Sequence, residues 1–175
     1  MTGRDFDSIY AGYSRMVYWA AYSVIKNPAA AMDLSQEVFL KAYRHMKQLS
    51  SMNDGQIKNW LYRVSVNAAV DVLRRNKREV LTDAPSDTAL CSRSDQPESA
   101  YDDTERKEAL RQAIDEMPDI YRQTVLLHYF SQLSYEEIAS AMNVSVGTVK
   151  SRMLRAKNQL ARILKGRGYD DKTDI

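Results

Sequence analysis

A polar stretch near the middle of the chain most limits what the sequence can fold into, because helical apolar periodicity lies on both sides of it and is absent within it. Residues 79–107 contain 8 acidic and 3 basic side chains and are rich in Asp, Ser and Pro. This composition is typical of a linker. The 175-residue chain is therefore predicted to be all-α, with two small helical domains, residues 1–78 and 108–168, joined by a flexible acidic linker and followed by a tail, 169–175.

Composition argues against several other classes of protein. The longest run without a charged residue, 123–135, has 13 residues, too short to cross a bilayer. The first residues lack the apolar core of a signal peptide, and a single cysteine cannot form an internal disulfide. We therefore expect a cytoplasmic protein that does not insert into a membrane. With only two histidines, one cysteine and no glycine-rich phosphate loop, we expect no metal, no cofactor and no enzyme activity.

Apolar residues in the first half recur every three or four positions, which is the period of an amphipathic helix. The first helix is expected to start near Phe6 and to end before Pro28, since proline blocks helix continuation. A second is expected from Ala29, and a third over residues 56 to about 75. The third helix is predicted to direct these residues at the core: Leu61, Val64, Ala68 and Val72.

The second predicted helix has a mixed face opposite its core side. The residues on this face are Asp33, Gln36, Glu37, Leu40 and Arg44. A leucine among carboxylates and an amide suits a protein docking surface, which combines apolar contact with directed hydrogen bonds. Plain solvent exposure explains the pattern equally well, so both interpretations stay open.

The third predicted helix has a face suited to single-stranded nucleic acid. Trp60 offers a surface for base stacking, Asn67 a paired donor and acceptor, and Arg74 begins a basic run that can neutralise phosphate. Taken alone, the pattern favours a more ordinary interpretation. In that interpretation Trp60 anchors the core and Asn67 is a satisfied polar residue of the helix.

The second half contains the pattern of a helix-turn-helix. Ser134 and Glu137 form a predicted capping box, Asn143 suits a left-handed helix end, and Ser145 can cap the next helix. That next helix is basic, with seven basic and no acidic residues between Val144 and Tyr169. Such a second helix enters the major groove of DNA. Its predicted outward-facing residues include Thr148, Ser151, Arg152, Arg155 and Arg162.

Three segments, in this order, resemble the extracytoplasmic-function (ECF) group of bacterial sigma factors. They are residues 33–40 (DLSQEVFL), 60–67 (WLYRVSVN), and 133–139 (LSYEEIA) with 146–152 (VGTVKSR). The resemblance covers nearly all of the chain except the linker and the tail. It implies a sigma region 2 bundle followed by a sigma region 4 helix-turn-helix bundle. It also implies a sigma factor that directs core RNA polymerase to specific promoters and initiates transcription, in a stress or stimulus response.

The resemblance also implies roles for particular residues. Docking on a coiled coil of the largest polymerase subunit falls to Asp33, Gln36, Glu37 and Leu40. Binding of the minus-10 element, as single-stranded DNA, falls to Asn67, Trp60, Arg63, Asn53 and Arg74. Recognition of the minus-35 element, as duplex, falls to Thr148, Lys150, Ser151, Arg152 and Arg155. Further implied partners are the polymerase flap and an anti-sigma factor.

Two alternative functions remain at this point. The protein could be a helix-turn-helix regulator that binds an operator as a dimer, without core polymerase. The two-domain asymmetry and the mixed face of the second helix argue against this. It could instead be a sigma mimic that sequesters an anti-sigma factor, but such a mimic is expected to have lost the basic residues that are present here.

Overall fold

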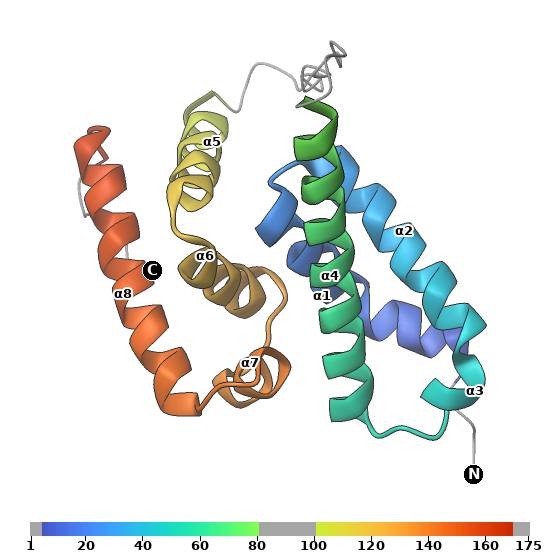
Figure 1. The fold of residues 1–175 in the computed structure, drawn as a ribbon. Coiled ribbons are helices and arrows are strands. Elements are labelled where there is room, and N and C mark those ends of the chain that lie inside the picture. Colours follow the sequence, from blue (N-terminus) through green and yellow to red (C-terminus); the bar gives the residue numbers. More distant parts are fainter. Residues whose placement is uncertain (1–4, 81–100, 170–175) are drawn as a thin grey trace.

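The computed structural model describes residues 5–80 and 101–169, and every regular element in these ranges is a helix, which confirms the all-α prediction. None of the described helices is both long enough and apolar enough to cross a membrane. The elements are α1 (Phe6–Ile25), α2 (Pro28–Arg44), α3 (Met46–Leu49), α4 (Asp54–Val80), α5 (Tyr101–Glu116), α6 (Asp119–Val125), the π-helix η1 (Leu126–Phe130), α7 (Tyr135–Met142) and α8 (Val146–Gly166). We call α1–α4 the first module and α5–α8 the second module (Figure 1).

Side-chain caps set the helix boundaries of the first module. Asp5 accepts a hydrogen bond from the Ser8 amide, at 3.0 Å, and so caps α1. Asn27 accepts one from the Ala30 amide, also at 3.0 Å, with Pro28 at the first position of α2. The proline therefore both separates the two helices, as predicted, and starts the second one.

The buried face of α4 differs from the predicted one. Its fully buried residues include Leu61, Ser65 and Ala69, while Val64 and Ala68 are only half-buried. The reason is that α4 packs against α1 and α2 on one side and against α7 on the other. Because α4 has a neighbour on each side, its most buried residues are not those at the centre of its apolar stripe. Apolar periodicity within one helix does not show which neighbours will cover it.

The helix-turn-helix forms as predicted. The Ser134 hydroxyl accepts from the Glu137 amide at 3.2 Å, and the Ser134 amide donates to the Glu137 carboxylate at 2.8 Å. Asn143 ends α7 in the left-handed conformation, with φ of 54°. Ser145 then caps α8, accepting from the Thr148 amide at 3.1 Å.

Helical structure reaches into both ends of the expected linker. α4 continues to Val80, and α5 begins at Tyr101, so the helical part of the second half starts before residue 108. Residues 104–107 are exposed on all sides and consist of Thr, Glu, Arg and Lys. Three of these residue types have good helix propensity. Because no side of this segment is buried, apolar periodicity cannot detect it. The central part of the expected linker, residues 81–100, lies outside the described residues.

The two modules share their apolar core. One cluster joins Met16 and Leu61 of the first module to Leu127 and Ile138 of the second. Another cluster contains residues of α1, α2 and α4 together with residues of α5, α6 and α8. In Figure 1 the second module lies alongside α1 and α4. The modules therefore form one packed body in this structure.

A fully buried arginine lies where the modules meet, and the sequence reasoning did not identify it. Arg122 of α6 is 0% exposed. Its guanidinium donates to the Ser23 carbonyl at 2.7 Å, to the Met117 carbonyl at 2.6 Å and to the Asp119 carboxylate at 2.5 Å. Because these acceptors surround it, the buried charge is compensated. Arg122 thereby ties the end of α1 to the turn between α5 and α6.

We expect Arg122→Met to lower the free energy of unfolding by about 3 kcal/mol, because it leaves buried carbonyl groups without their donor. Chemical denaturation monitored by circular dichroism measures this. Arg162→Met, at an exposed position of α8, is the matched control and is expected to change stability by less than about 0.5 kcal/mol. Equal effects of the two substitutions would contradict this account of Arg122.

Tyr62 of α4 is also buried between the modules. Its hydroxyl donates to the Gln123 side chain at 3.3 Å, and only 6% of the residue is exposed. Burial raises the pKa of Tyr62 to about 12, and the nearby charge of Arg152 opposes that shift. The protonated phenol is therefore the form that the folded state favours.

This shift predicts a loss of stability in alkali. Since the folded pKa of Tyr62 lies above the ordinary value of 10.0, its contribution is complete below pH 10 and declines as the pH rises toward 12. The loss is at most about 3 kcal/mol. Denaturation at several pH values should show a shallower alkaline decline for Tyr62→Phe than for the wild type. Parallel declines for the two proteins would show that Tyr62 does not contribute.

Candidate nucleic-acid and protein interfaces

The mixed face of α2 is exposed, as its pattern predicted. Asp33, Gln36, Glu37 and Leu40 all face solvent, while Leu34, Val38 and Ala42 on the opposite side are buried and hold α2 against α1 and α4. Leu40 is 59% exposed. The structure thus brings the four predicted docking residues onto one accessible surface.

Exposed aromatic residues extend this surface, and the sequence reasoning missed them. Tyr43 is 64% exposed and Tyr10 is 51% exposed. Phe6 contacts the Tyr43 ring edge-on, with centroids 5.4 Å apart, and Tyr10 contacts Phe39 at 4.7 Å. Tyr43 lies three positions after Leu40, a spacing that could have identified it. Exposed aromatic residues with polar groups around them are typical of a protein interface.

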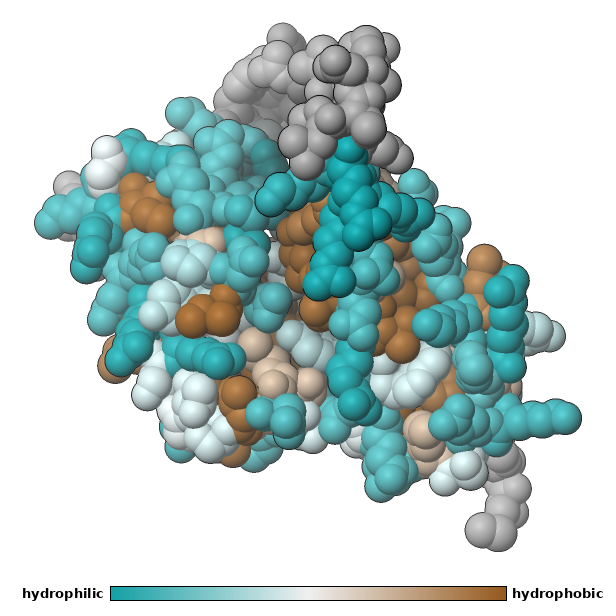
Figure 2. All heavy atoms as spheres, viewed as in Figure 1, coloured by the Kyte–Doolittle hydropathy of each residue, from teal (hydrophilic) through white to brown (hydrophobic). Residues whose placement is uncertain are grey.

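Three of the five predicted minus-10 residues lie on an exposed ridge along α4. Arg63, Asn67 and Arg74 are exposed, and Figure 2 shows a hydrophilic ridge over α4 with apolar surface on both sides. A weak ion pair joins Arg74 and Asp71 at 3.9 Å, with both side chains largely exposed. Exposed ion pairs of this kind contribute little stability, so Arg74 is available to an external phosphate.

Two of the predicted minus-10 residues also have structural roles. Trp60 is half-buried against the first apolar cluster, and its ring lies 6.0 Å from that of His45. Its structural environment therefore partly supports the more ordinary interpretation of a core anchor. Asn53 and Gln56 form reciprocal hydrogen bonds of 2.9 and 3.0 Å between side chain and backbone at the start of α4. This contact fixes the position of the loop before the helix.

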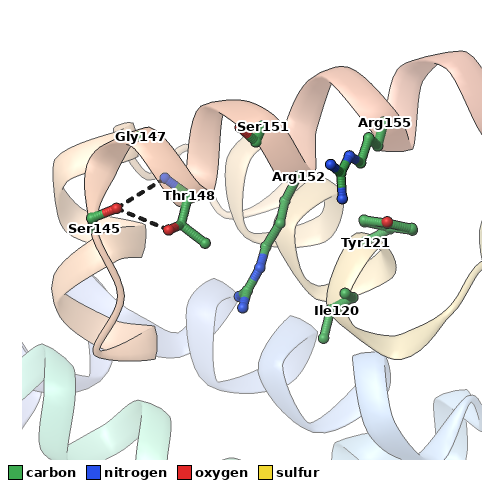
Figure 3. Close-up of a pocket in the computed structure, with 8 residues that line it drawn as sticks. All are labelled: Ile120, Tyr121, Ser145, Gly147, Thr148, Ser151, Arg152 and Arg155. Carbon is green, nitrogen blue, oxygen red and sulfur yellow. Dashed lines mark hydrogen bonds between the residues drawn. The ribbon is translucent and has the colours of Figure 1, made fainter.

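The predicted minus-35 residues lie near the start of α8, around a pocket of about 530 Å³ (Figure 3). Ser151 and Arg155 are exposed, and Thr148 is half-buried. Lys150 is exposed but does not line this pocket. Ile120 and Tyr121 of α6 form the other wall, which the sequence reasoning did not predict.

The electrostatics of this region suit an anion. The first turn of α8 contains no acidic side chain, and its backbone amides carry the positive end of the helix dipole. Arg155 adds a full charge to the same pocket. At Gly147 an added Cβ would meet only the Ser145 hydroxyl within 4 Å, at 3.8 Å, so the backbone there is open to close approach. The arrangement can bind phosphate and present side chains to base edges.

Arg152 departs from the predicted outward orientation. It is half-buried, and Figure 3 shows its guanidinium pointing away from Arg155 and toward the helices of the first module. Its charge acts on Tyr62 of α4. The structure therefore brings Thr148, Ser151 and Arg155 together around the pocket, and Arg152 also lines it while its guanidinium points toward the first module.

Within the described part of the chain, no three His, Cys, Asp or Glu side chains gather in a way that could hold a metal ion.

Comparison with known proteins supports two sigma regions. Residues 9–79 match the family model of Sigma-70 region 2, and residues 107–160 match that of Sigma-70, region 4. The ECF RNA polymerase sigma factor SigM of Bacillus subtilis is 35% identical, over 94% of this chain and 98% of its own length. SigW of the same organism, also an ECF RNA polymerase sigma factor, is 30% identical over 91% of this chain and 89% of its own length.

Two solved structures share the fold. One is the sigma factor RpoE in complex with the anti-sigma factor NepR from Bartonella quintana, with a TM-score of 0.65 and 24% identity over 92% of this chain and 97% of that chain. The other is CnrH in complex with the cytosolic domain of CnrY, with a TM-score of 0.62 and 18% identity over 92% and 88% of the two chains. Together with the two matched regions and the similarity to SigM along almost the whole chain, the arrangement of helices leads to one conclusion: the chain belongs to the ECF group of RNA polymerase sigma factors.

Proposed function

We propose that this protein binds core RNA polymerase and directs it to specific promoters, while catalysis stays with the polymerase. In this proposal residues 1–78 act as region 2, residues 108–168 act as region 4, and the protein works in the cytoplasm. The observation that carries the proposal is the presence, on one chain, of three features: an exposed face of α2, an exposed polar ridge on α4 and a capped helix-turn-helix. We call the face of α2 with Asp33, Gln36, Glu37 and Leu40 the docking face.

The docking face would hold the coiled coil of the largest polymerase subunit. The carboxylates of Asp33 and Glu37 would accept hydrogen bonds from basic side chains of that subunit, and Leu40 would supply apolar contact. Tyr43, close to Leu40, is positioned to enlarge the apolar part of the contact. Tyrosine is frequent at such positions because it combines a large surface with a polar hydroxyl.

The ridge on α4 would trap unpaired bases of the minus-10 element. Turning a base out of the duplex costs a few kcal/mol. Stacking on the Trp60 ring and hydrogen bonds to Asn67 would offset that cost, while Arg63 and Arg74 would hold phosphate. Opening of the duplex would then depend on the base sequence of the minus-10 element.

The start of α8 would read the minus-35 element. Arg155 can donate two hydrogen bonds to a guanine. The Ser151 hydroxyl can donate a hydrogen bond to a base edge or accept one from it, and Lys150 would hold phosphate. The second module would also meet the polymerase flap. An anti-sigma factor is a further proposed partner, supported by the fold shared with two proteins solved as complexes, one of them with an anti-sigma factor named in its description.

Neither alternative function is favoured. The match to region 2 argues against an operator-binding regulator that works without polymerase, and the basic residues of α8 argue against a mimic that does not bind DNA.

Run-off transcription with purified core polymerase over a randomised promoter library tests the proposal directly. The polymerase should select start sites only when this protein is added. The absence of selection would reject the proposal.

Glu37→Lys should weaken association with core polymerase at least about tenfold. The substitution replaces an exposed hydrogen-bond acceptor by a positive charge, which would repel the basic side chains of the proposed partner. Titration of labelled core polymerase measures the affinity. Glu105→Lys, an exposed position on α5, has the same charge change and is expected to have little effect. Circular dichroism should show both variants folded. Unaltered affinity of Glu37→Lys would exclude this face as the docking surface.

Arg155→Ala in the holoenzyme should cost about 1 to 3 kcal/mol on promoters selected from the library. The cost should fall mainly on promoters with the preferred upstream element, and a scrambled element should reduce it. Arg162→Ala removes an exposed arginine two turns further along α8 and serves as the control. A uniform loss on both kinds of promoter would assign Arg155 to phosphate binding rather than to base recognition.

A further inference from the structure

The loop that joins α3 to α4, residues 50–53, is held by its own hydrogen bonds (Figure 1). The backbone amides of Ser50, Ser51 and Met52 each donate to a carbonyl of α3, over 2.9 to 3.2 Å. The Ser50 and Ser51 hydroxyls donate to the carbonyls of Lys47 and Gln48, at 3.1 and 2.7 Å. The donors of these residues are therefore engaged before any partner arrives, and the loop has a defined shape.

Contacts with the core and with α1 anchor this loop at both ends. Leu49 before the loop and Ile57 after it are fully buried, and Met52 is half-buried against the first apolar cluster. The Tyr13 hydroxyl of α1 donates to the Asp54 carboxylate at 3.2 Å, although the two residues are 41 positions apart. A loop fixed in this way presents its side chains in a constant orientation.

The side-chain amide of Asn53 is the group whose orientation is defined most closely. Its Oδ1 accepts a hydrogen bond from the Gln56 backbone amide at 2.9 Å, and the Asn53 backbone amide donates to Gln56 Oε1 at 3.0 Å. A backbone amide can only donate, so the side-chain atom that faces it is the oxygen. The other atom, Nδ2, belongs to an exposed side chain and donates to no acceptor within the described part of the chain. Asn53 therefore offers a donor to an external group while its acceptor is engaged.

Asn53 begins a row of residues assigned to the minus-10 strand. Trp60, Asn67 and Arg74 follow it at intervals of seven residues. Seven residues are close to two helical turns, with a drift of only about 20°, so the row follows one side of α4. Asn53 and Asn67 are about 21 Å apart along the helix axis. Since neighbouring bases of one duplex strand are about 3.4 Å apart, these two residues would meet different nucleotides.

We propose that Asn53 contacts one unpaired base of the minus-10 element through Nδ2, as a hydrogen-bond donor, and that Gln56 is a positioning residue that holds Asn53 in this orientation. The inference rests on the proposed function of α4 and adds a chemical rule for one base. An unrestrained asparagine binds adenine with its donor and its acceptor together. Because Gln56 occupies the acceptor, Asn53 favours the bases with a carbonyl oxygen at the paired edge, guanine and thymine. Adenine and cytosine carry an amino group there, which is itself a donor.

Asn53→Asp separates the structural role of this residue from its contact with a base. Aspartate keeps the oxygen that accepts from the Gln56 amide and is a favourable helix cap, but it replaces Nδ2 by an acceptor. Transcription by the holoenzyme over a library randomised in the minus-10 element gives the base preference at each position. At one position the ratio of guanine and thymine to adenine and cytosine should fall about fivefold or more. The added negative charge weakens binding to every sequence alike, so it does not alter this ratio.

Unchanged base preferences at every position for folded, active Asn53→Asp would overturn the inference. Asn53→Ser keeps a capping oxygen without adding charge, and it provides the same test if the aspartate variant does not support transcription. Its ratio at the same position should fall toward one, and a ratio equal to that of the wild type would overturn the inference. Circular dichroism checks that each variant is folded.

The role of Gln56 is tested by a loss and a rescue. Gln56→Ala removes the acceptor of the Asn53 backbone amide and should lower the same ratio about threefold or more. Gln56→Glu keeps that acceptor and should keep the wild-type ratio. Gln48→Ala, at an exposed position of α3, is the control and should also keep it. A purely structural role would lower transcription from all promoters and leave the ratio unchanged. That result, or a glutamate variant that behaves like the alanine variant, would overturn the positioning role.

The same library separates this inference from the proposed function. If the wild-type protein never confers start-site selection, the proposed function itself fails. If the wild-type protein selects start sites and Asn53→Asp selects the same bases, only the inference about Asn53 is wrong. Asn67→Ala should alter the preference at a different position from Asn53→Asp, and an effect of both at one position only would contradict the proposed contact.

Discussion

Burial of the apolar faces of α1 is the constraint on which the rest of the structure depends. Met16, Val17 and Ala20 lie in a cluster that also contains Leu61 of α4 and Leu127 of η1, and Ala21 and Val24 lie in a second cluster with Ile114 and other residues of the second module. Each module alone buries too little surface to leave a large stability margin. Sharing α1 gives both modules a common core.

The shared core requires hydrogen-bond partners for the polar groups at its margin. The last turn of α1 points carbonyl groups toward α5 and α6, and Arg122 and Lys26 donate to backbone carbonyls at this junction. No buried side-chain polar atom within the described ranges lacks a hydrogen-bond partner. The interface between the modules therefore combines buried apolar contact with hydrogen bonds that satisfy its polar groups.

The proposed interfaces differ in how much of each the packed arrangement leaves accessible. The docking face on α2 and the ridge on α4 both face solvent, so neither requires rearrangement before binding. In the helix-turn-helix, Glu137 of α7 pairs with Lys58 of α4, and Arg152 of α8 is half-buried.

The sequence by itself determined the local features: the boundary between α1 and α2 at Asn27 and Pro28, the end of α7 at Asn143, the capping box, the side of α2 that faces solvent, and the family to which the chain belongs. These depend on residues within a turn or two of one another, or on short ordered motifs. Tertiary structure alone decided which side of α4 is most buried, that Arg122 is enclosed, that Arg152 is half-buried, and that the modules share one core. Periodicity defines the faces of a helix relative to its own axis, but which neighbour covers each face depends on contacts between residues far apart in the chain. The start of α5 also escaped prediction, because an exposed helical segment has no buried side to produce a pattern.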